Sequence, residues 1–149
     1  MKQYTIEPAS EGDYPRLLFI WEAAVRATHH FLAERDITFY KQQIPELYFP
    51  SVSLFIAKDD DKSISGFLGI SSNNIEMLFV DPDHFGRGAG KELTRFAIEE
   101  KNITNVDVNE QNPQALGFYQ SLGFVVRSRS ERDGDNNPFP ILHLELERD

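Results

Sequence analysis

Three glycines at alternate positions form the most distinctive chemical feature of the sequence. Residues 80–91 read VDPDHFGRGAGK, which predicts the end of a strand, a tight turn and the start of a helix. Gly86, Gly88 and Gly90 lack the Cβ atoms that would keep a ligand away from the backbone. The first N–H groups of a helix have no intrahelical acceptor, and the helix dipole is positive there. This segment therefore predicts a site for an anion, most naturally a phosphate.

Two well-known phosphate-binding loops do not fit this segment. A Walker loop requires glycine where Phe85 stands and serine or threonine where Glu92 stands. The dinucleotide fingerprint requires its third glycine at the position of Lys91, and it follows a first strand rather than a fourth. A glycine-rich turn that serves only close packing stays open as an alternative.

A short helix bearing two adjacent aromatic residues follows the next predicted strand. Asn112 is a typical helix cap, Pro113 suits the first helical position, and Gly123 suits the left-handed residue that ends a helix. The spacing places Phe118 and Tyr119 toward the sheet. On this pattern alone, Tyr119 is more often a core residue than a catalytic one.

Composition excludes several classes of protein. The 149 residues correspond to one domain, residues 1–149, at roughly 100 to 200 residues per domain. The net charge of −9 opposes binding to nucleic acid or anionic lipid. The absence of cysteine excludes disulfides and a catalytic thiol, and the four histidines show no metal-ligand spacing. The histidine spacing leads us to expect no metal site. Because no apolar run approaches about 20 residues and no signal peptide is recognisable, we also expect a cytoplasmic protein.

The elements that must position these residues follow from periodicity and turn signals. Strands are predicted at residues 4–7, 52–58, 64–70, 75–80, 103–109, 124–130 and 141–147. Helices are predicted from Asp13 to about His29 and His30, at 35–47, at 88–101 and at 113–122. Pro45 and Pro50 are expected to close the second helix. This order predicts one mixed sheet with helices on both faces.

Taken together, the glycine turn and the Tyr119 helix resemble the GNAT superfamily of N-acetyltransferases. The acetyl-CoA site of that family combines a glycine-rich turn after the fourth strand with an Asn…Ala…Phe-Tyr…Gly-Phe helix after the fifth. Residues 27–32, 109–112 and 129–140 look like its small bacterial YjaB-like branch. The resemblance covers almost the whole chain. It implies an α/β (α+β) fold with a mixed, mostly antiparallel sheet of about seven strands.

The resemblance also implies how acetyl-CoA would bind. The pyrophosphate would lie on the backbone N–H groups of the glycine turn, where Phe85 replaces the family's usual Gln or Arg. The pantetheine arm would pair with the strand at 78–80, and an N–H near Phe79 or Val80 would stabilise the oxyanion. The implied cofactor-binding residues are Leu78, Phe79, Val80, Phe85, Gly86, Arg87, Gly88, Ala89, Gly90, Lys91, Asn109, Asn112, Phe118 and Tyr119.

The catalytic groups are also carried over from the resemblance. Tyr119 is the candidate general acid, because a phenol within reach can protonate the departing CoA thiolate. The base that takes a proton from the acceptor amine is open between Glu76, His30, His29 and water. Glu76 at a strand start and histidines at a helix end also have purely structural interpretations.

The sequence therefore predicts transfer of the acetyl group from acetyl-CoA to a primary amine by direct attack in a ternary complex. The acceptor is a small molecule or a peptide, at a lysine or N-terminus, and the protein is a monomer or a homodimer. One alternative is a non-catalytic CoA-binding module that senses acetyl-CoA or pairs with a partner. Another is an unrelated α/β domain that binds a different anion.

Overall fold

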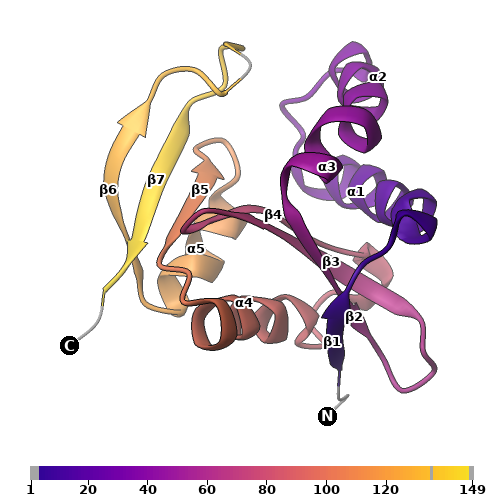
Figure 1. The fold of residues 1–149 in the computed structure, drawn as a ribbon. Helices are drawn as coiled ribbons and strands as arrows, with labels where there is room; N and C mark the ends of the chain where they lie inside the picture. Colours follow the sequence, from indigo (N-terminus) through magenta and orange to yellow (C-terminus); the bar gives the residue numbers. More distant parts are fainter. Residues whose placement is uncertain (1–3, 135, 148–149) are drawn as a thin grey trace.

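The computed structural model describes residues 4–134 and 136–147, and its centre is one mixed sheet (Figure 1). Within these residues the sheet has seven strands in the order β1-β2-β3-β4-β5-β7-β6. The strands are β1 (Thr5–Pro8), β2 (Ser53–Lys58), β3 (Ile64–Ser71), β4 (Asn74–Val80), β5 (Asn105–Asn109), β6 (Phe124–Ser130) and β7 (Ile141–Leu146). The β4–β5 pair is parallel and all other pairs are antiparallel. The predicted mixed, mostly antiparallel sheet is thereby confirmed.

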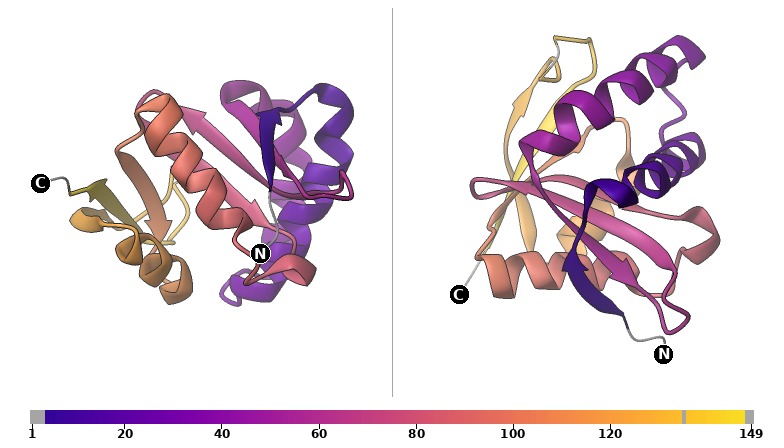
Figure 2. Two further views of the ribbon diagram at one scale, coloured as in Figure 1. Left: turned by 90° about the horizontal axis from the view of Figure 1, so that it is seen from below. Right: turned by 45° about the vertical axis from the view of Figure 1, so that its right-hand side comes forward.

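Helices cover both faces of the sheet, as predicted. The helices are α1 (Tyr14–Thr28), α2 (Glu34–Gln43), α3 (Phe49–Ser51), α4 (Ala89–Lys101) and α5 (Pro113–Ser121), with the shorter turns η1 (Glu11–Asp13), η2 (Ile44–Tyr48) and η3 (Pro82–His84). Helices α1 and α2 lie on one face of β1 to β4, whereas on the other face of the sheet α4 lies against β2 to β4 and α5 lies beside β5 and β6 (Figures 1 and 2).

Alternation along the strands produces two separate hydrophobic cores. Successive side chains of a strand point to opposite faces. On β2, Phe55 and Ala57 therefore belong to the core that includes residues of α4 and α5, while Ile56 belongs to the core that includes residues of α1 and α2. On β3, Leu68 and Phe67 divide in the same way. The strands that carry the site are thus fixed from both sides.

The ends of two helices differ from the sequence-based expectation. Helix α4 ends at Lys101, the following residue Asn102 has a left-handed φ of 56°, and the Ile103 N–H donates to the Ala97 carbonyl at 3.0 Å. This hydrogen bond ties Ile103 to the last turn of the helix, so the strand predicted from Ile103 begins two residues later. The two prolines expected to close the second helix, Pro45 and Pro50, also do not end the helical structure.

Helical structure continues through both prolines up to Ser51. Pro45 lies in the first turn of a π-helical segment, closed by the Phe49 N–H donating to the Ile44 carbonyl. Pro50 likewise lies in the first turn of α3. Proline is tolerated in such positions because its missing N–H has no acceptor to reach.

Strands β4 and β5 are joined at one end only. Their pairing comprises Asn74 with Asn105 and Ile75 with Val106, after which the strands diverge (Figure 1). Opposite, β3 pairs Gly69 with Met77 but Ile70 with Ile75, so Glu76 is the extra residue of a β-bulge. The edge of β4 beyond Glu76 therefore has no strand beside it on the β5 side.

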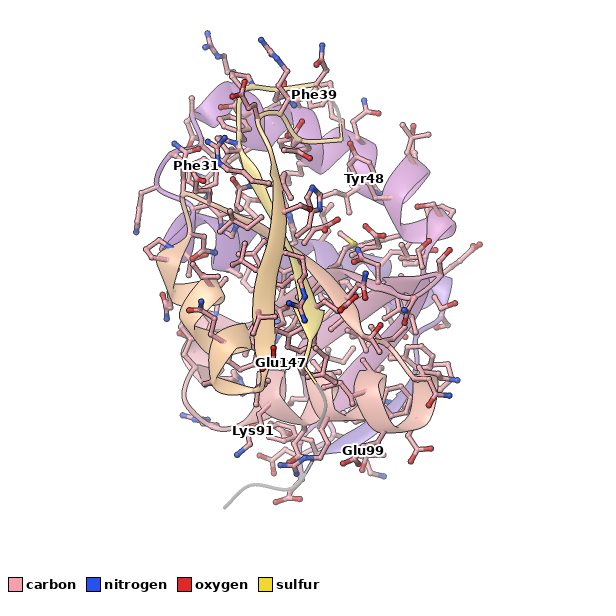
Figure 3. All side chains as sticks on the ribbon, turned by 90° about the vertical axis from the view of Figure 1, so that its left-hand side faces the viewer. Phe31, Phe39, Tyr48, Lys91, Glu99 and Glu147 are labelled. Atoms are coloured by element: carbon pink, nitrogen blue, oxygen red, sulfur yellow. The ribbon has the colours of Figure 1, made fainter. Side chains whose placement is uncertain are left out.

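The β6–β7 connection folds against the α2 region. The Tyr40 hydroxyl donates to Asp133 Oδ2 at 3.0 Å, and Asn137 Nδ2 donates to the Tyr40 oxygen at 2.7 Å. The rings of Phe31 and Phe139 lie 5.4 Å apart. Viewed from the side of β6 and β7, Phe31 and Tyr48 lie on opposite sides of these strands (Figure 3). Elements distant in sequence therefore enclose one end of the molecule.

Over the described ranges, every helix is too short or too polar to span a bilayer.

Candidate active site

The glycine turn at the start of α4 leaves a row of backbone donors unpaired. Gly86 and Gly88 have φ values of 78° and 94°, a region that side chains with a Cβ atom rarely adopt. A Cβ atom on either residue would meet nothing within 4 Å. The N–H groups of residues 86–91 donate to no other described residue. Such a row of donors, which we call the anion cradle, suits an anion, and the anion site predicted from the spacing stays a prediction.

Buried polar groups hold the turn in place. Asp81 is 5% exposed, and its Oδ1 accepts from the Asp83 N–H at 3.0 Å. Its Oδ2 accepts from Arg16 of α1 at 2.8 Å, and the same Arg16 nitrogen donates to the Ile64 carbonyl at 2.9 Å. The end of β4 is therefore fixed to α1 and β3 immediately before the glycines.

A cavity of about 400 Å³ extends from the glycine turn along the end of β4, toward α5. It is bounded by the predicted strand residues Leu78, Phe79 and Val80, by Phe85 and the turn residues except Arg87, and by α5. Gly90 faces the Phe118 ring, and a Cβ atom at this position would make ordinary van der Waals contact with that ring at 3.6 Å. We call this space the donor cavity.

Tyr119 lies at the inner end of the donor cavity. Asn112 caps α5, with its Oδ1 accepting the Ala115 N–H at 3.2 Å, which fixes the start of the helix. The Tyr119 ring packs at 5.6 Å from Phe124, and the residue is 5% exposed. Burial raises the pKa of its phenol, which therefore keeps its proton at neutral pH. Its hydroxyl has no hydrogen-bond partner among the described residues.

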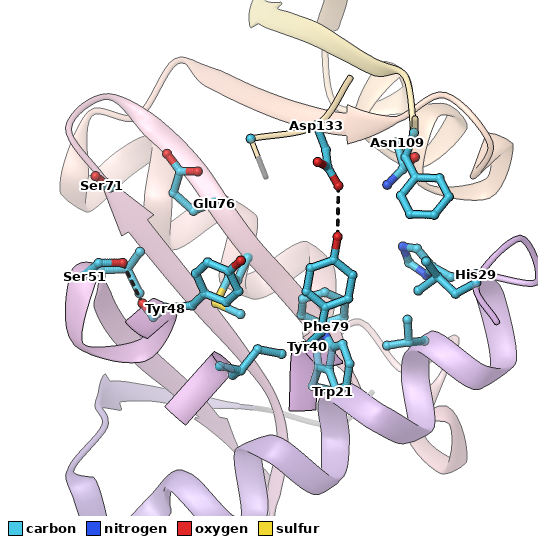
Figure 4. A pocket seen from close by; sticks show the side chains of 17 residues that line it. Trp21, His29, Tyr40, Tyr48, Ser51, Ser71, Glu76, Phe79, Asn109 and Asp133 are labelled. Carbon is cyan, nitrogen blue, oxygen red and sulfur yellow. Dashed lines mark hydrogen bonds between the residues drawn. The ribbon is translucent and has the colours of Figure 1, made fainter. Parts of the chain in front are cut away.

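A second cavity of about 520 Å³ lies on the other side of β4, beneath α2 and the β6–β7 connection. Figure 4 shows Trp21, Tyr40 and Tyr48 around it, with Glu76 and His29 on opposite sides of the Tyr40–Asp133 hydrogen bond. Glu76 makes no ion pair or hydrogen bond with a described residue. We call this space the acceptor cavity.

The two cavities meet at His29 and Phe79, which line both. A smaller space of about 100 Å³ lies in the divergence of β4 and β5. That space is lined by the same two residues together with Glu76, Asn109 and Tyr119. The divergence of the sheet therefore brings a proton-bearing phenol, an imidazole and a carboxylate around one opening.

Comparison with known proteins agrees with this geometry. The family model described as Acetyltransferase (GNAT) domain matches residues 50–126. The chain belongs to the GNAT family of acetyltransferases. The peptidyl-lysine N-acetyltransferase YjaB of Salmonella typhimurium is 38% identical over 137 residues, which cover 90% of each chain. The solution structure of apo YjaB from Escherichia coli has a TM-score of 0.89 at 33% identity, covering 97% of each chain.

A more distant relative shares the GNAT fold alone. The PaiA N-acetyltransferase of Thermoplasma acidophilum, solved in complex with coenzyme A, has a TM-score of 0.73 at 20% identity, covering 97% of this chain and 99% of that one. Membership of the family identifies the chain as an N-acetyltransferase, and the family's acyl donor is acetyl-CoA. It excludes an unrelated phosphate-binding domain, and the non-catalytic alternative finds no support.

The GNAT site does not bring all the predicted residues together. Asn109 lines the acceptor side and not the donor cavity, and its Oδ1 is buried without a hydrogen-bond partner among the described residues. His30 is exposed and lines a separate groove beside Gln111 and Gln114. Arg87 and Lys91 are exposed at the glycine turn, and neither forms an ion pair with a described residue.

Several residues that line the site were not foreseen from the sequence. Trp21, Tyr40 and Phe139 line the acceptor cavity, yet each reads as an ordinary aromatic residue of a helix or loop. Tyr40 and Asp133 are 93 positions apart, and no local pattern connects them. Thr28 was also missed, and its only signal is its place immediately before the paired histidines.

Proposed function

We propose that this enzyme transfers the acetyl group of acetyl-CoA to the ε-amine of a lysine side chain in a peptide or protein. The transfer proceeds by direct attack in a ternary complex. The observation that carries the proposal is the meeting of two cavities at His29 and Phe79, one lined by unpaired backbone donors and the other by aromatic rings and a free carboxylate. Donor and acceptor can occupy the molecule together.

The donor cavity suits the diphosphate and pantetheine parts of coenzyme A. The unpaired N–H groups of residues 86–91 would hold the diphosphate, with the cations of Arg87 and Lys91 beside it. The free edge of β4 offers the backbone groups that an extended amide chain needs. Asn112 uses its oxygen as a helix cap, so its side-chain N–H₂ is the part left to donate to that chain.

The reacting groups would sit where β4 and β5 diverge. The thioester supplies an activated acetyl group, and the backbone near Phe79 and Val80 would stabilise the negative charge that develops on its oxygen. Tyr119 would give its proton to the departing sulfur. Because burial raises its pKa, the phenol would release this proton only when negative charge develops on the sulfur.

The acceptor cavity fits a cation at the end of an apolar stem. Trp21, Tyr40 and Phe79 offer rings against which the four-carbon chain of lysine can lie. Glu76 would attract the ammonium group, and the unpaired Asn109 Oδ1 would accept one of its hydrogens. The relatives named peptidyl-lysine N-acetyltransferase support this class of acceptor.

Direct measurement of transfer tests the proposal. The protein is mixed with acetyl-CoA and a lysine-containing peptide, and release of free thiol is followed beside a peptide in which arginine replaces lysine. We expect thiol release only with lysine, and mass spectrometry to place one acetyl group on its side chain. Binding of acetyl-CoA without transfer to any lysine peptide would contradict the proposal.

The setting of the reaction is part of the same proposal. We propose that the enzyme acts in the cytoplasm, without a metal, as a monomer or homodimer. Its net charge of −9 supports a cationic acceptor over nucleic acid or an anionic membrane.

A further inference from the structure

His29 is a titratable side chain that lies where the donor and acceptor cavities meet. It follows the last residue of α1, and its N–H donates to the Val25 carbonyl at 2.7 Å. Its ring lies 5.4 Å from the Phe31 ring and 6.4 Å from the Phe79 ring. It borders the donor cavity, the acceptor cavity and the divergence of the sheet. Packing therefore holds the imidazole at the point where the acetyl group would pass from the sulfur of coenzyme A to the acceptor nitrogen.

We infer that Nε2 of His29 accepts the proton that the acceptor nitrogen loses as its bond to the acetyl carbon forms. We further infer that Thr28 is a positioning residue that fixes the tautomer this step needs. Both inferences rest on the proposed function.

The hydrogen bonds of Thr28 determine which ring nitrogen carries the proton. A threonine hydroxyl has one hydrogen to donate. Thr28 Oγ1 lies 2.8 Å from the Ala24 carbonyl, which can only accept, so the hydroxyl hydrogen goes there. Thr28 Oγ1 also lies 2.8 Å from His29 Nδ1, and it must accept in that contact. Nδ1 therefore carries the hydrogen, and Nε2 of the neutral ring carries the lone pair.

The surroundings keep the ring neutral. Burial lowers the pKa of His29 to about 4, and the positive charge that His30 can carry adds to the effect. Besides His29, the titratable side chains that line these connected cavities are Tyr40, Tyr48, Glu76, His84, Lys91, Asp107, Tyr119 and Asp133. Glu76 and Asp133 come from β4 and the β6–β7 connection, and Tyr119 comes from α5. At neutral pH the lone pair of Nε2 is therefore available, and the ring does not repel a cationic acceptor.

Each proton that moves in this reaction has a donor and an acceptor among the groups already described. The acceptor nitrogen reaches the carbonyl carbon as a neutral amine, after its ammonium form has released one proton to solvent. Formation of the C–N bond makes the nitrogen positive and far more acidic than a free ammonium, so a weakly basic imidazole can take its proton. The C–S bond breaks with its electron pair on sulfur, which takes the proton of Tyr119. Imidazolium and phenolate then return to their starting states by exchange with solvent.

This role differs from that of Glu76. Glu76 and His29 lie on opposite sides of the Tyr40–Asp133 hydrogen bond (Figure 4). Glu76 is exposed, whereas His29 is partly buried at the junction with the donor cavity. Attraction of the ammonium group and acceptance of the proton that the nitrogen loses on bond formation are thereby assigned to separate side chains.

The tautomer can be measured without any turnover. In the full-length protein at pH 7, the ¹⁵N shifts and long-range ¹H–¹⁵N couplings of the His29 ring should show the hydrogen on Nδ1. Thr28→Val keeps the shape of the side chain but removes the hydroxyl, and should shift the ring toward a mixture of tautomers. Thr28→Ser should restore the Nδ1 form. A wild-type ring protonated at Nε2 would overturn the assignment of Thr28.

Kinetics test the proton transfer itself, with the lysine peptide as acceptor. His29→Gln should lower kcat about 100-fold while leaving the KM for acetyl-CoA near that of the wild type. Thr28→Val should lower kcat about tenfold, and Thr28→Ser should recover it. Full kcat in His29→Gln, or a loss found in His30→Gln instead, would overturn the inference while wild-type acetylation stands. If the wild type itself transfers no acetyl group to lysine, the proposed function fails.

Discussion

Tyr119 combines a buried ring with a hydroxyl that no described residue binds. We expect Tyr119→Phe to keep the fold, because no protein partner loses a hydrogen bond, and to lower kcat about 100-fold through loss of the proton donor. Steady-state kinetics with acetyl-CoA and a lysine peptide measure this, and Tyr14→Phe in the other core is the matched control. Unchanged kcat with an unchanged melting temperature would remove Tyr119 from the mechanism.

Glu76 owes its exposed position to the β-bulge in β4. A bulge leaves one residue unpaired and directs its side chain anew. If Glu76 attracts the ammonium group, Glu76→Gln should raise the KM for a lysine peptide about tenfold, with kcat nearly unchanged. Glu99→Gln on the exposed side of α4 is the control for loss of one charge. A fall in kcat at saturating peptide would instead assign Glu76 to proton transfer.

His29 makes the stability of the protein sensitive to mild acid. Its pKa is about 4 in the folded protein against 6.5 when free, so the unfolded chain binds a proton first as pH falls. The contribution of the neutral His29 ring to the free energy of unfolding is fully present above pH 6.5 and is lost progressively as the pH falls toward 4. Urea unfolding at pH 7.5 and pH 5.0 should show a smaller loss in His29→Gln than in the wild type. Equal losses in the two proteins would contradict the burial of a neutral ring.

The glycine turn and α4 act as one element, and the turn's conformation is the sensitive part. Gly88 has a φ of 94°, but among the described residues a Cβ atom there would have no neighbour within 4 Å. Gly88→Ala should therefore cost about 1 to 2 kcal/mol in folding and weaken coenzyme A binding much more, because the methyl group enters the anion cradle. Calorimetry measures the binding, and Gly12→Ala is the control. Unchanged affinity would place the diphosphate elsewhere.

Elements with their own periodicity or caps could be predicted from the sequence. Helix α5 was recognisable because Asn112 and Pro113 begin it and Gly123 follows it, and the structure confirms these positions. The helical path through Pro45 could not be predicted, because the π-turn depends on packing of Ile44 and Phe49 in a core built from distant residues. Local rules treat proline as a helix breaker, and here tertiary contacts override them.

The two cavities also differ in how far their lining residues could be predicted from the sequence. The donor cavity is lined mainly by residues 78–91 and 112–119, two local segments whose motifs carry the family resemblance, so that resemblance named most of its lining in advance, whereas its α1 residues Ala24 and Thr28 were not named. The acceptor cavity is assembled from α1, α2, β4 and the β6–β7 connection. A contact such as that of Tyr40 with Asn137, 97 positions apart, leaves no trace in local sequence.

At the scale of the whole molecule, Tyr40 ties the β6–β7 connection to α2 across the acceptor cavity. Tyr40→Phe removes its hydrogen bonds with Asp133 and Asn137 and should cost about 1 to 2 kcal/mol of stability. Hydrogen–deuterium exchange should become faster at Asp133, Asn136, Asn137 and Phe139 and stay unchanged in α4, which serves as the internal control. Unchanged exchange at these four residues would show that other contacts hold this connection.

The two-pair contact between β4 and β5 gives the sheet a pivot. Asn73 reinforces it, because its Oδ1 accepts the Thr104 N–H at 3.0 Å and its Nδ2 donates to Thr104 Oγ1. Val80 lies five residues beyond Ile75, about 16 Å along the strand, so a rotation of about 5° at the pivot moves it by about 1.5 Å. Such a shift is comparable to one methylene group. We therefore expect substitutions at Asn73 or Thr104 to alter the length of acyl chain that fits between the two arms.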